Sequence, residues 1–132
     1  MQLQFPKRFS DQLYSLMRVA AGFLFACHGA QKLFGVLGSP QMVHVPLMLA
    51  AGIIEFFGGL LIALGAFTAI AAFVASGEMA TAYFLQHAPH GFWPIRNHGE
   101  LAVLLCFVFL YIASHGDGTW SVRRFLKGKR LS

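Results

Sequence analysis

The chain has 132 residues, of which 57% are hydrophobic and only 11% are charged, and its formal net charge is +5. Soluble domains contain about 25% charged residues, so this composition excludes an ordinary soluble protein and indicates an integral membrane protein. A nucleic-acid partner is not expected, because seven of the ten lysines and arginines lie at the two ends: Lys7, Arg8, Arg123, Arg124, Lys127, Lys129 and Arg130. Basic residues placed in this way are typical of cytoplasmic segments beside anionic lipid headgroups.

Hydropathy and helix-breaking residues divide the chain into four predicted membrane spans, over residues 12–36, 46–66, 68–86 and 98–114. The first span is interpreted as uncleaved, because it is too long for a signal peptide and lacks a small-residue cleavage site. The second begins at Pro46, a favourable first residue for a helix, and the short LGAFT connection predicts a hairpin with the third. Pro89, Gly91 and Pro94 interrupt the helix before the fourth span. A basic tail follows over residues 120–132.

These features predict a single domain that is an all-α integral membrane protein, a four-transmembrane-helix antiparallel bundle. Each span has about 17–25 residues, which is enough to cross the ~30 Å hydrocarbon core of a bilayer. An even number of spans with basic residues at both ends predicts that both termini are cytoplasmic.

Three ionisable residues are expected at one level near the middle of the bilayer. Counted from the outer end of each span at the α-helical rise, His28, Glu55 and Glu78 have the same depth. Small residues recur beside each glutamate, as in close helix contacts in lipid, so both carboxyl groups are predicted to face the bundle interior.

A second, shallower layer contains Lys32 and Glu100, and Arg18 lies toward the cytoplasmic side. Arg18, His28 and Lys32 share one face of the first span. We therefore expect His28 and Lys32 to face the three glutamates across the bundle.

Structural explanations compete with functional ones. Asn97 and Glu100 have the spacing of a helix capping box, Arg18 and Lys32 could extend to the interfaces, and the mid-membrane cluster could serve only helix packing.

Cys27 and Cys106 have no metal-ligand spacing, although their similar depth leaves a redox pair as a minor alternative. No metal site and no intrinsic cofactor are predicted, since His28 is the only histidine deep within a span.

Several segments in order, RVAAGFLFACHGAQKLFG, AGIIEFFGGLLIALGAFT, GEMATAYF, GFWPIRNHGE and GDGTWSV, together resemble the DoxX family of small bacterial membrane proteins. The resemblance covers Arg18 to Val122. It implies a four-helix protein of the bacterial inner (plasma) membrane and an association with the redox chemistry of quinones, catechols or thiols. It also implies that the functional residues are Arg18, His28, Lys32, Glu55, Glu78 and Glu100.

The leading hypothesis is a membrane redox component that binds a quinone-like or other small apolar substrate. His28, Glu55 and Glu78 are the candidate catalytic residues, and Arg18, Lys32 and Glu100 the candidate substrate-binding residues. His28 and Lys32 would donate hydrogen bonds to the substrate, and the two glutamates would exchange protons with it.

The alternatives are a non-catalytic subunit or assembly partner of a membrane oxidoreductase, and a small transporter or proton pathway. Whether the chain is an enzyme, such as a quinone-linked oxidoreductase, stays open. The expected partners are the lipid bilayer and a membrane or soluble redox protein, and a quinone is the one cofactor expected to bind.

Overall fold

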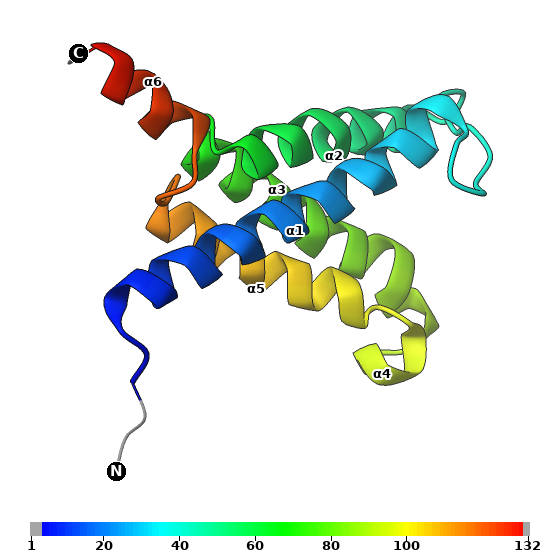
Figure 1. Ribbon diagram of the computed structural model, residues 1–132. Coiled ribbons are helices and arrows are strands. Elements are labelled where there is room, and N and C mark those ends of the chain that lie inside the picture. Colours follow the sequence, from blue (N-terminus) through cyan, green and yellow to red (C-terminus); the bar gives the residue numbers. More distant parts are fainter. Residues whose placement is uncertain (1–3, 131–132) are drawn as a thin grey trace.

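The computed structural model describes residues 4–130, and the regular structure within them is entirely helical (Figure 1). In chain order the elements are α1 (Lys7–Phe34), α2 (Pro46–Leu64), α3 (Thr68–Ala82), the π-helical turn η1 (Tyr83–His87), the 3-10 turn η2 (Ala88–His90), α4 (Pro94–Asn97), α5 (Glu100–His115) and α6 (Val122–Arg130). The prediction of an all-α protein is confirmed for this part of the chain.

The long helices form two closely packed pairs, α1 with α2 and α3 with α5. Between the pairs, α2 contacts α3 less extensively and α1 touches α5 only locally. The start of α1 and helix α6 lie at one end of the molecule, here called the terminal end, and the loop over residues 35–45 and α4 lie at the other, the loop end (Figure 1). The molecule therefore consists of two helix pairs, and it is not a bundle in which every adjacent pair of helices packs equally.

Glycine allows α1 and α2 to approach closely. A methyl group on Gly22 would lie 2.5 Å from the backbone nitrogen of Ala63, and one on Gly29 or Gly59 would overlap backbone atoms of the facing helix. Small residues at helix contacts are the usual packing device in lipid. Larger side chains fill the centre of the molecule, where the rings of Phe25 and Phe109 lie 4.7 Å apart.

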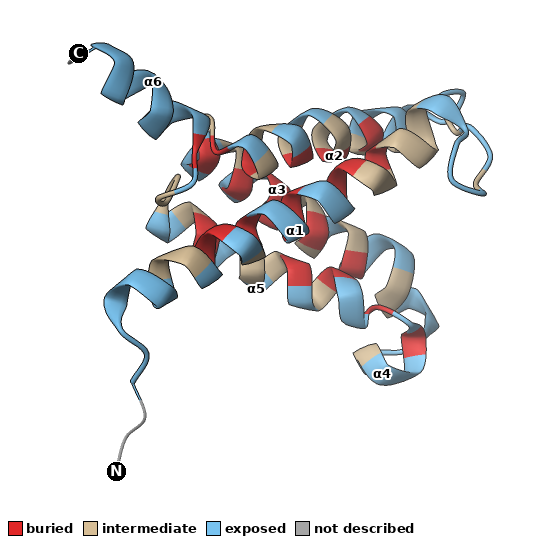
Figure 2. Cartoon of the chain, in the orientation of Figure 1, coloured by how far each residue is buried: buried red, intermediate tan, exposed pale blue. Residues whose placement is uncertain are grey.

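The outer faces of the helices are apolar. Phe23, Phe57, Phe73 and Phe107, on α1, α2, α3 and α5, are each more than half exposed, while the buried positions lie on the sides that face other helices (Figure 2). Exposed apolar surface of this extent suits hydrocarbon rather than water.

Three helical segments are long and apolar enough to cross a membrane: α1, α2 and the continuous stretch Thr68–His90. Helix α5 is apolar but has only 16 residues, which at 1.5 Å per residue is shorter than the ~30 Å core. The membrane assignment therefore holds for these three segments, and the fourth crossing stays a prediction.

Two predicted boundaries differ from the structure by more than two residues. Helix α1 begins at Lys7 rather than near residue 12, since the polar KRFSD stretch continues the helix beyond the apolar run. The third predicted span is not one uniform helix, because α3 ends at Ala82 and passes into η1 and η2. The hairpin predicted from LGAFT is confirmed, with α2 ending at Leu64 and α3 beginning at Thr68.

The predicted capping box at Asn97 and Glu100 is wrong. Asn97 ends α4, and Gly99 precedes Glu100, the first residue of α5. The buried Asn97 amide donates hydrogen bonds to the Gly91 carbonyl at 2.6 Å and the Tyr83 hydroxyl at 3.2 Å, and its oxygen accepts one from the Gly99 N–H at 2.9 Å. Asn97 therefore ties η1 to the start of α5 instead of capping that helix from three residues upstream.

Candidate functional site

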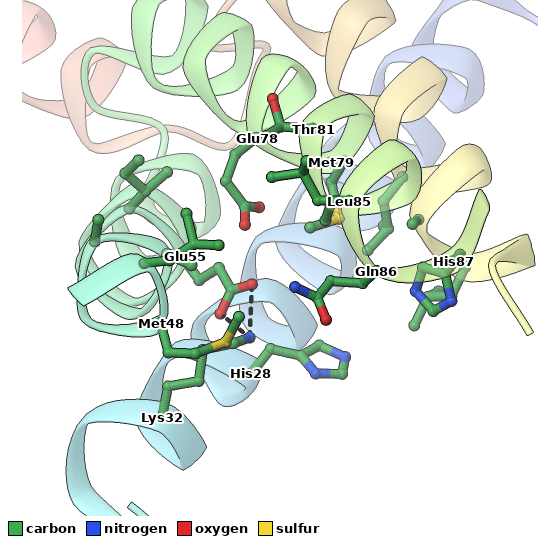
Figure 3. A pocket seen from close by; sticks show the side chains of 18 of the residues that line it. His28, Lys32, Met48, Glu55, Glu78, Met79, Thr81, Leu85, Gln86 and His87 are labelled. Carbon is green, nitrogen blue, oxygen red and sulfur yellow. Dashed lines mark hydrogen bonds and ion pairs between the residues drawn. The ribbon is translucent and has the colours of Figure 1, made fainter. Parts of the chain in front are cut away.

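A cavity of about 660 Å³ lies between the two helix pairs, toward the loop end (Figure 3). Helices α1, α2, α3 and α5, together with η1, contribute to its walls. Most of its lining is apolar and includes Leu47, Ile54, Val74, Leu85 and Leu101. Its volume is within the range of about 300–1,000 Å³ that small-molecule sites occupy.

An ion pair crosses one wall of the cavity. The Nζ of Lys32 lies 2.6 Å from Oε2 and 2.8 Å from Oε1 of Glu55, as the dashed lines in Figure 3 show. Glu55 is 3% exposed and Lys32 is 21% exposed. The close packing of α1 on α2 brings the two side chains together, which confirms that Lys32 faces Glu55.

Glu78 projects from α3 into the same cavity, with its carboxyl group directed toward Glu55 (Figure 3). Its Oε2 is buried and has no hydrogen-bond partner among the described residues. An unsatisfied buried polar atom is costly, so this oxygen is a natural contact for a bound molecule. Neither glutamate faces lipid, as predicted.

His28 lines the cavity one helical turn from Lys32 on α1. With Lys32, Glu55 and Glu78 it completes a set of ionisable side chains from three helices (Figure 3). Two carboxylates and one ammonium give these three groups a formal charge of −1. A cluster of this kind in a membrane interior can bind and release a proton.

Arg18 and Glu100 do not belong to this cluster. Arg18 is fully buried nearer the terminal end, where its guanidinium donates hydrogen bonds to the carbonyls of Ile62 at 2.5 Å, Ala63 at 2.8 Å and Trp120. These contacts satisfy carbonyls in the last turn of α2, which is a structural role. Glu100 is exposed at the start of α5 and is not part of the cavity lining.

Sequence reasoning missed other polar cavity residues, Gln86, His87 and His98. The η1 turn places Gln86 and His87 at the cavity, and Nδ1 of His87 also lies 3.2 Å from the carbonyl oxygen of Asn97. π-Helical turns often occur at functional sites, but their position is not apparent from hydropathy.

The two cysteines are free thiols and are only partly buried. Sγ of Cys106 lies 3.5 Å from Oγ of Ser76, at the contact between α3 and α5. Cys27 directly precedes His28 on α1 but is not part of the cavity lining. No disulfide links the pair in this structure.

Comparison with known sequences gives two matches. A sequence model of the DoxX family matches residues 13–88, which include His28, Lys32, Glu55 and Glu78. A protein of Haemophilus influenzae, described only as uncharacterized, is 37% identical over 129 residues, covering 92% of this chain and 96% of its own length. No solved structure matches the chain.

Proposed function

The chain belongs to the DoxX family of membrane proteins, and from this premise we propose that its cavity binds a quinone-like molecule or another small apolar substrate in a redox process. The observation that carries the proposal is the convergence of His28, Lys32, Glu55 and Glu78 on a mostly apolar cavity of about 660 Å³. Apolar pockets with a few convergent polar groups are the usual form of small-molecule sites.

A quinone matches this distribution of groups. Its ring and tail are apolar and suit walls such as Leu85 and Leu101, and its carbonyl oxygens accept hydrogen bonds. His28 is placed to donate one, and Lys32 can donate another because its ammonium carries more N–H groups than Glu55 occupies.

Proton transfer is the chemistry that the glutamates would supply. Reduction of a quinone to a quinol consumes two electrons and two protons, and a membrane or soluble redox partner would supply the electrons. Glu78, whose Oε2 has no other partner among residues 4–130, would pass one proton directly to a substrate oxygen, and Glu55 would pass the second through the Lys32 ammonium that it binds. Glu55 would act with Lys32 to set the charge of the cavity.

The proposed setting is the bacterial inner membrane, with α5 as a fourth crossing and both termini in the cytoplasm. The position of both the start of α1 and helix α6 at the terminal end supports an even number of crossings (Figure 1). The basic residues of α6 at this end support its cytoplasmic placement under the positive-inside rule.

Equilibrium binding of a short-chain benzoquinone to the purified protein in detergent tests the proposal. We expect saturable binding at one site per chain, and His28→Asn should raise the Kd at least about fivefold through loss of a hydrogen bond. Arg96→Gln is the matched control, since Arg96 is exposed and lies outside the cavity lining. Absence of saturable binding, or equal effects of the two variants, would contradict the proposal.

A further inference from the structure

Helix α6 (Val122–Arg130) is exposed at every residue. It is nine residues long, with the sequence VRRFLKGKR. A helix this short and this rich in like charges is not stable alone in water, so an external surface is expected to support it.

The residues of α6 divide into two faces. At 100° per residue, Val122, Phe125 and Leu126 fall on one side, and all are exposed. The basic residues Arg123, Arg124, Lys127 and Arg130 fall on the other side. The Nζ of Lys129 lies over the ring of Phe125, 5.0 Å from its centroid, so this lysine is on the apolar side of the helix, where a long stem lets its ammonium extend toward headgroups.

The segment over residues 116–121 fixes the start of α6. Tyr14 donates a hydrogen bond to the Gly116 carbonyl at 2.6 Å, and Arg18 donates one to the Trp120 carbonyl. The Ser121 hydroxyl accepts one from the N–H of Arg124 at 3.2 Å, in the first turn of α6. Helix α6 therefore leaves the molecule at a defined point of the terminal end, and in Figure 1 it projects away from the packed helices.

Asp117 joins this segment both to α3 and to α6. It accepts hydrogen bonds from the N–H of Thr68 at 3.4 Å and from Arg123 at 3.2 Å. Burial tends to raise the pKa of Asp117, but these hydrogen bonds outweigh burial and hold the pKa below its usual value. The carboxylate thus keeps the base of α6 attached to the start of α3.

More basic and aromatic groups lie at the same end. A small cleft beside the 116–121 segment is lined by Lys7, Arg8 and Trp120, among others, and Trp120 is half exposed. A surface that combines cations, an indole ring and an apolar helix face matches the headgroup region of a bilayer. It fits a nucleic acid less well, because phosphates and bases would leave Phe125 and Leu126 exposed to water, and the membrane crossed by α1–α3 is the apolar surface already beside this end of the chain.

We propose that α6 is an interfacial helix that binds the anionic phospholipids of the membrane crossed by α1–α3. Its apolar face enters the acyl boundary, and its cations contact lipid phosphates. Each basic residue near an anionic surface strengthens attachment about fivefold. Arg124, Lys127 and Arg130 together should therefore favour an anionic over a neutral surface by more than tenfold.

Amide hydrogen exchange of residues 122–130 in the full-length protein tests this proposal. The protein is placed in nanodiscs of neutral phosphatidylcholine, or of phosphatidylcholine with one-third phosphatidylglycerol. We expect exchange to be at least about tenfold slower in the anionic discs, and high salt should remove much of the difference. Quinone binding is not part of the readout, so the result is independent of the proposed function.

Two variants separate the contributions of charge and apolar surface. The triple variant Arg124→Gln, Lys127→Gln, Arg130→Gln should abolish the difference between discs, and Phe125→Ser with Leu126→Ser should give rapid exchange in both. Arg96→Gln, at the loop end, should change nothing. Equal exchange of the natural sequence in both discs, or a difference that survives the triple variant, would overturn the proposal.

Discussion

Replacing Glu55 by glutamine should destabilise the protein, because it leaves the ammonium of Lys32 without its carboxylate. Removing one partner of a fully buried ion pair costs about 3–5 kcal/mol, whereas exposed pairs contribute less than about 1 kcal/mol. Glu55 is 3% exposed and Lys32 is 21% exposed, which places this pair between the two limits. We expect a loss of about 2 kcal/mol in the free energy of unfolding.

Glu78→Gln is the matched comparison on the opposite wall. Because Oε2 of Glu78 has no hydrogen-bond partner among residues 4–130, the substitution removes a buried charge and breaks no observed bond. The free energy of unfolding should change by less than about 0.5 kcal/mol. Quinone binding or turnover should nevertheless fall, since glutamine cannot exchange a proton.

Thermal unfolding in detergent provides the assay. Glu55→Gln should lower the Tm by roughly 5–10 °C, and Glu78→Gln should leave it almost unchanged. A double-mutant cycle with Lys32→Met should give a coupling free energy of about 2 kcal/mol for the Lys32–Glu55 pair. Equal losses of Tm for the two glutamine variants, or a coupling near zero, would refute this reasoning.

Further predictions concern the topology and the terminal end. Reporter domains fused at Gly38 and Pro89 should read as periplasmic and one at the C-terminus as cytoplasmic; Gly38 and the C-terminus on the same side of the membrane would contradict four crossings. Arg18→Met should cost about 3 kcal/mol of unfolding free energy, because buried carbonyls lose a charged donor, and normal stability of this variant would show that water replaces the guanidinium. The stability that Asp117 adds, with its lowered pKa, should be present above about pH 4 and be lost as the pH falls. Asp117→Asn should remove that part of the acid dependence measured by unfolding.

The sequence was sufficient to predict the membrane class, the all-helical structure and the convergence of His28, Glu55 and Glu78. These predictions depend on hydropathy and helical spacing, which are local properties of the chain. Lys32 was assigned to a shallower layer than Glu55, yet the two form an ion pair. Counting backbone depth does not include the length of a lysine side chain, which extends several ångströms along the helix axis.

Other features required the tertiary arrangement. Glu100 shares a level with Lys32 in sequence counting, but the rotation of α5 leaves it exposed. Arg18 lies on the same face of α1 as His28. Only the position of the last turn of α2 shows that the hydrogen-bond partners of Arg18 are carbonyls. Gln86 lines the cavity because it belongs to the π-helical turn η1. The composition of the chain does not reveal where such a turn replaces α-helix.

The pairing of α1 with α2 has a consequence for biosynthesis. The chain emerges from the ribosome with its N-terminal half first, and the Lys32–Glu55 pair lies entirely within this half. Arg18 also finds the Ile62 and Ala63 carbonyls there. The first helical hairpin can thus enter the bilayer with the Lys32–Glu55 pair formed and Arg18 held by two carbonyls, before α3 is synthesised. Glu78 is synthesised afterwards, on α3. Its carboxyl group is therefore added to a helix pair in which the Lys32 ammonium is already bound by Glu55.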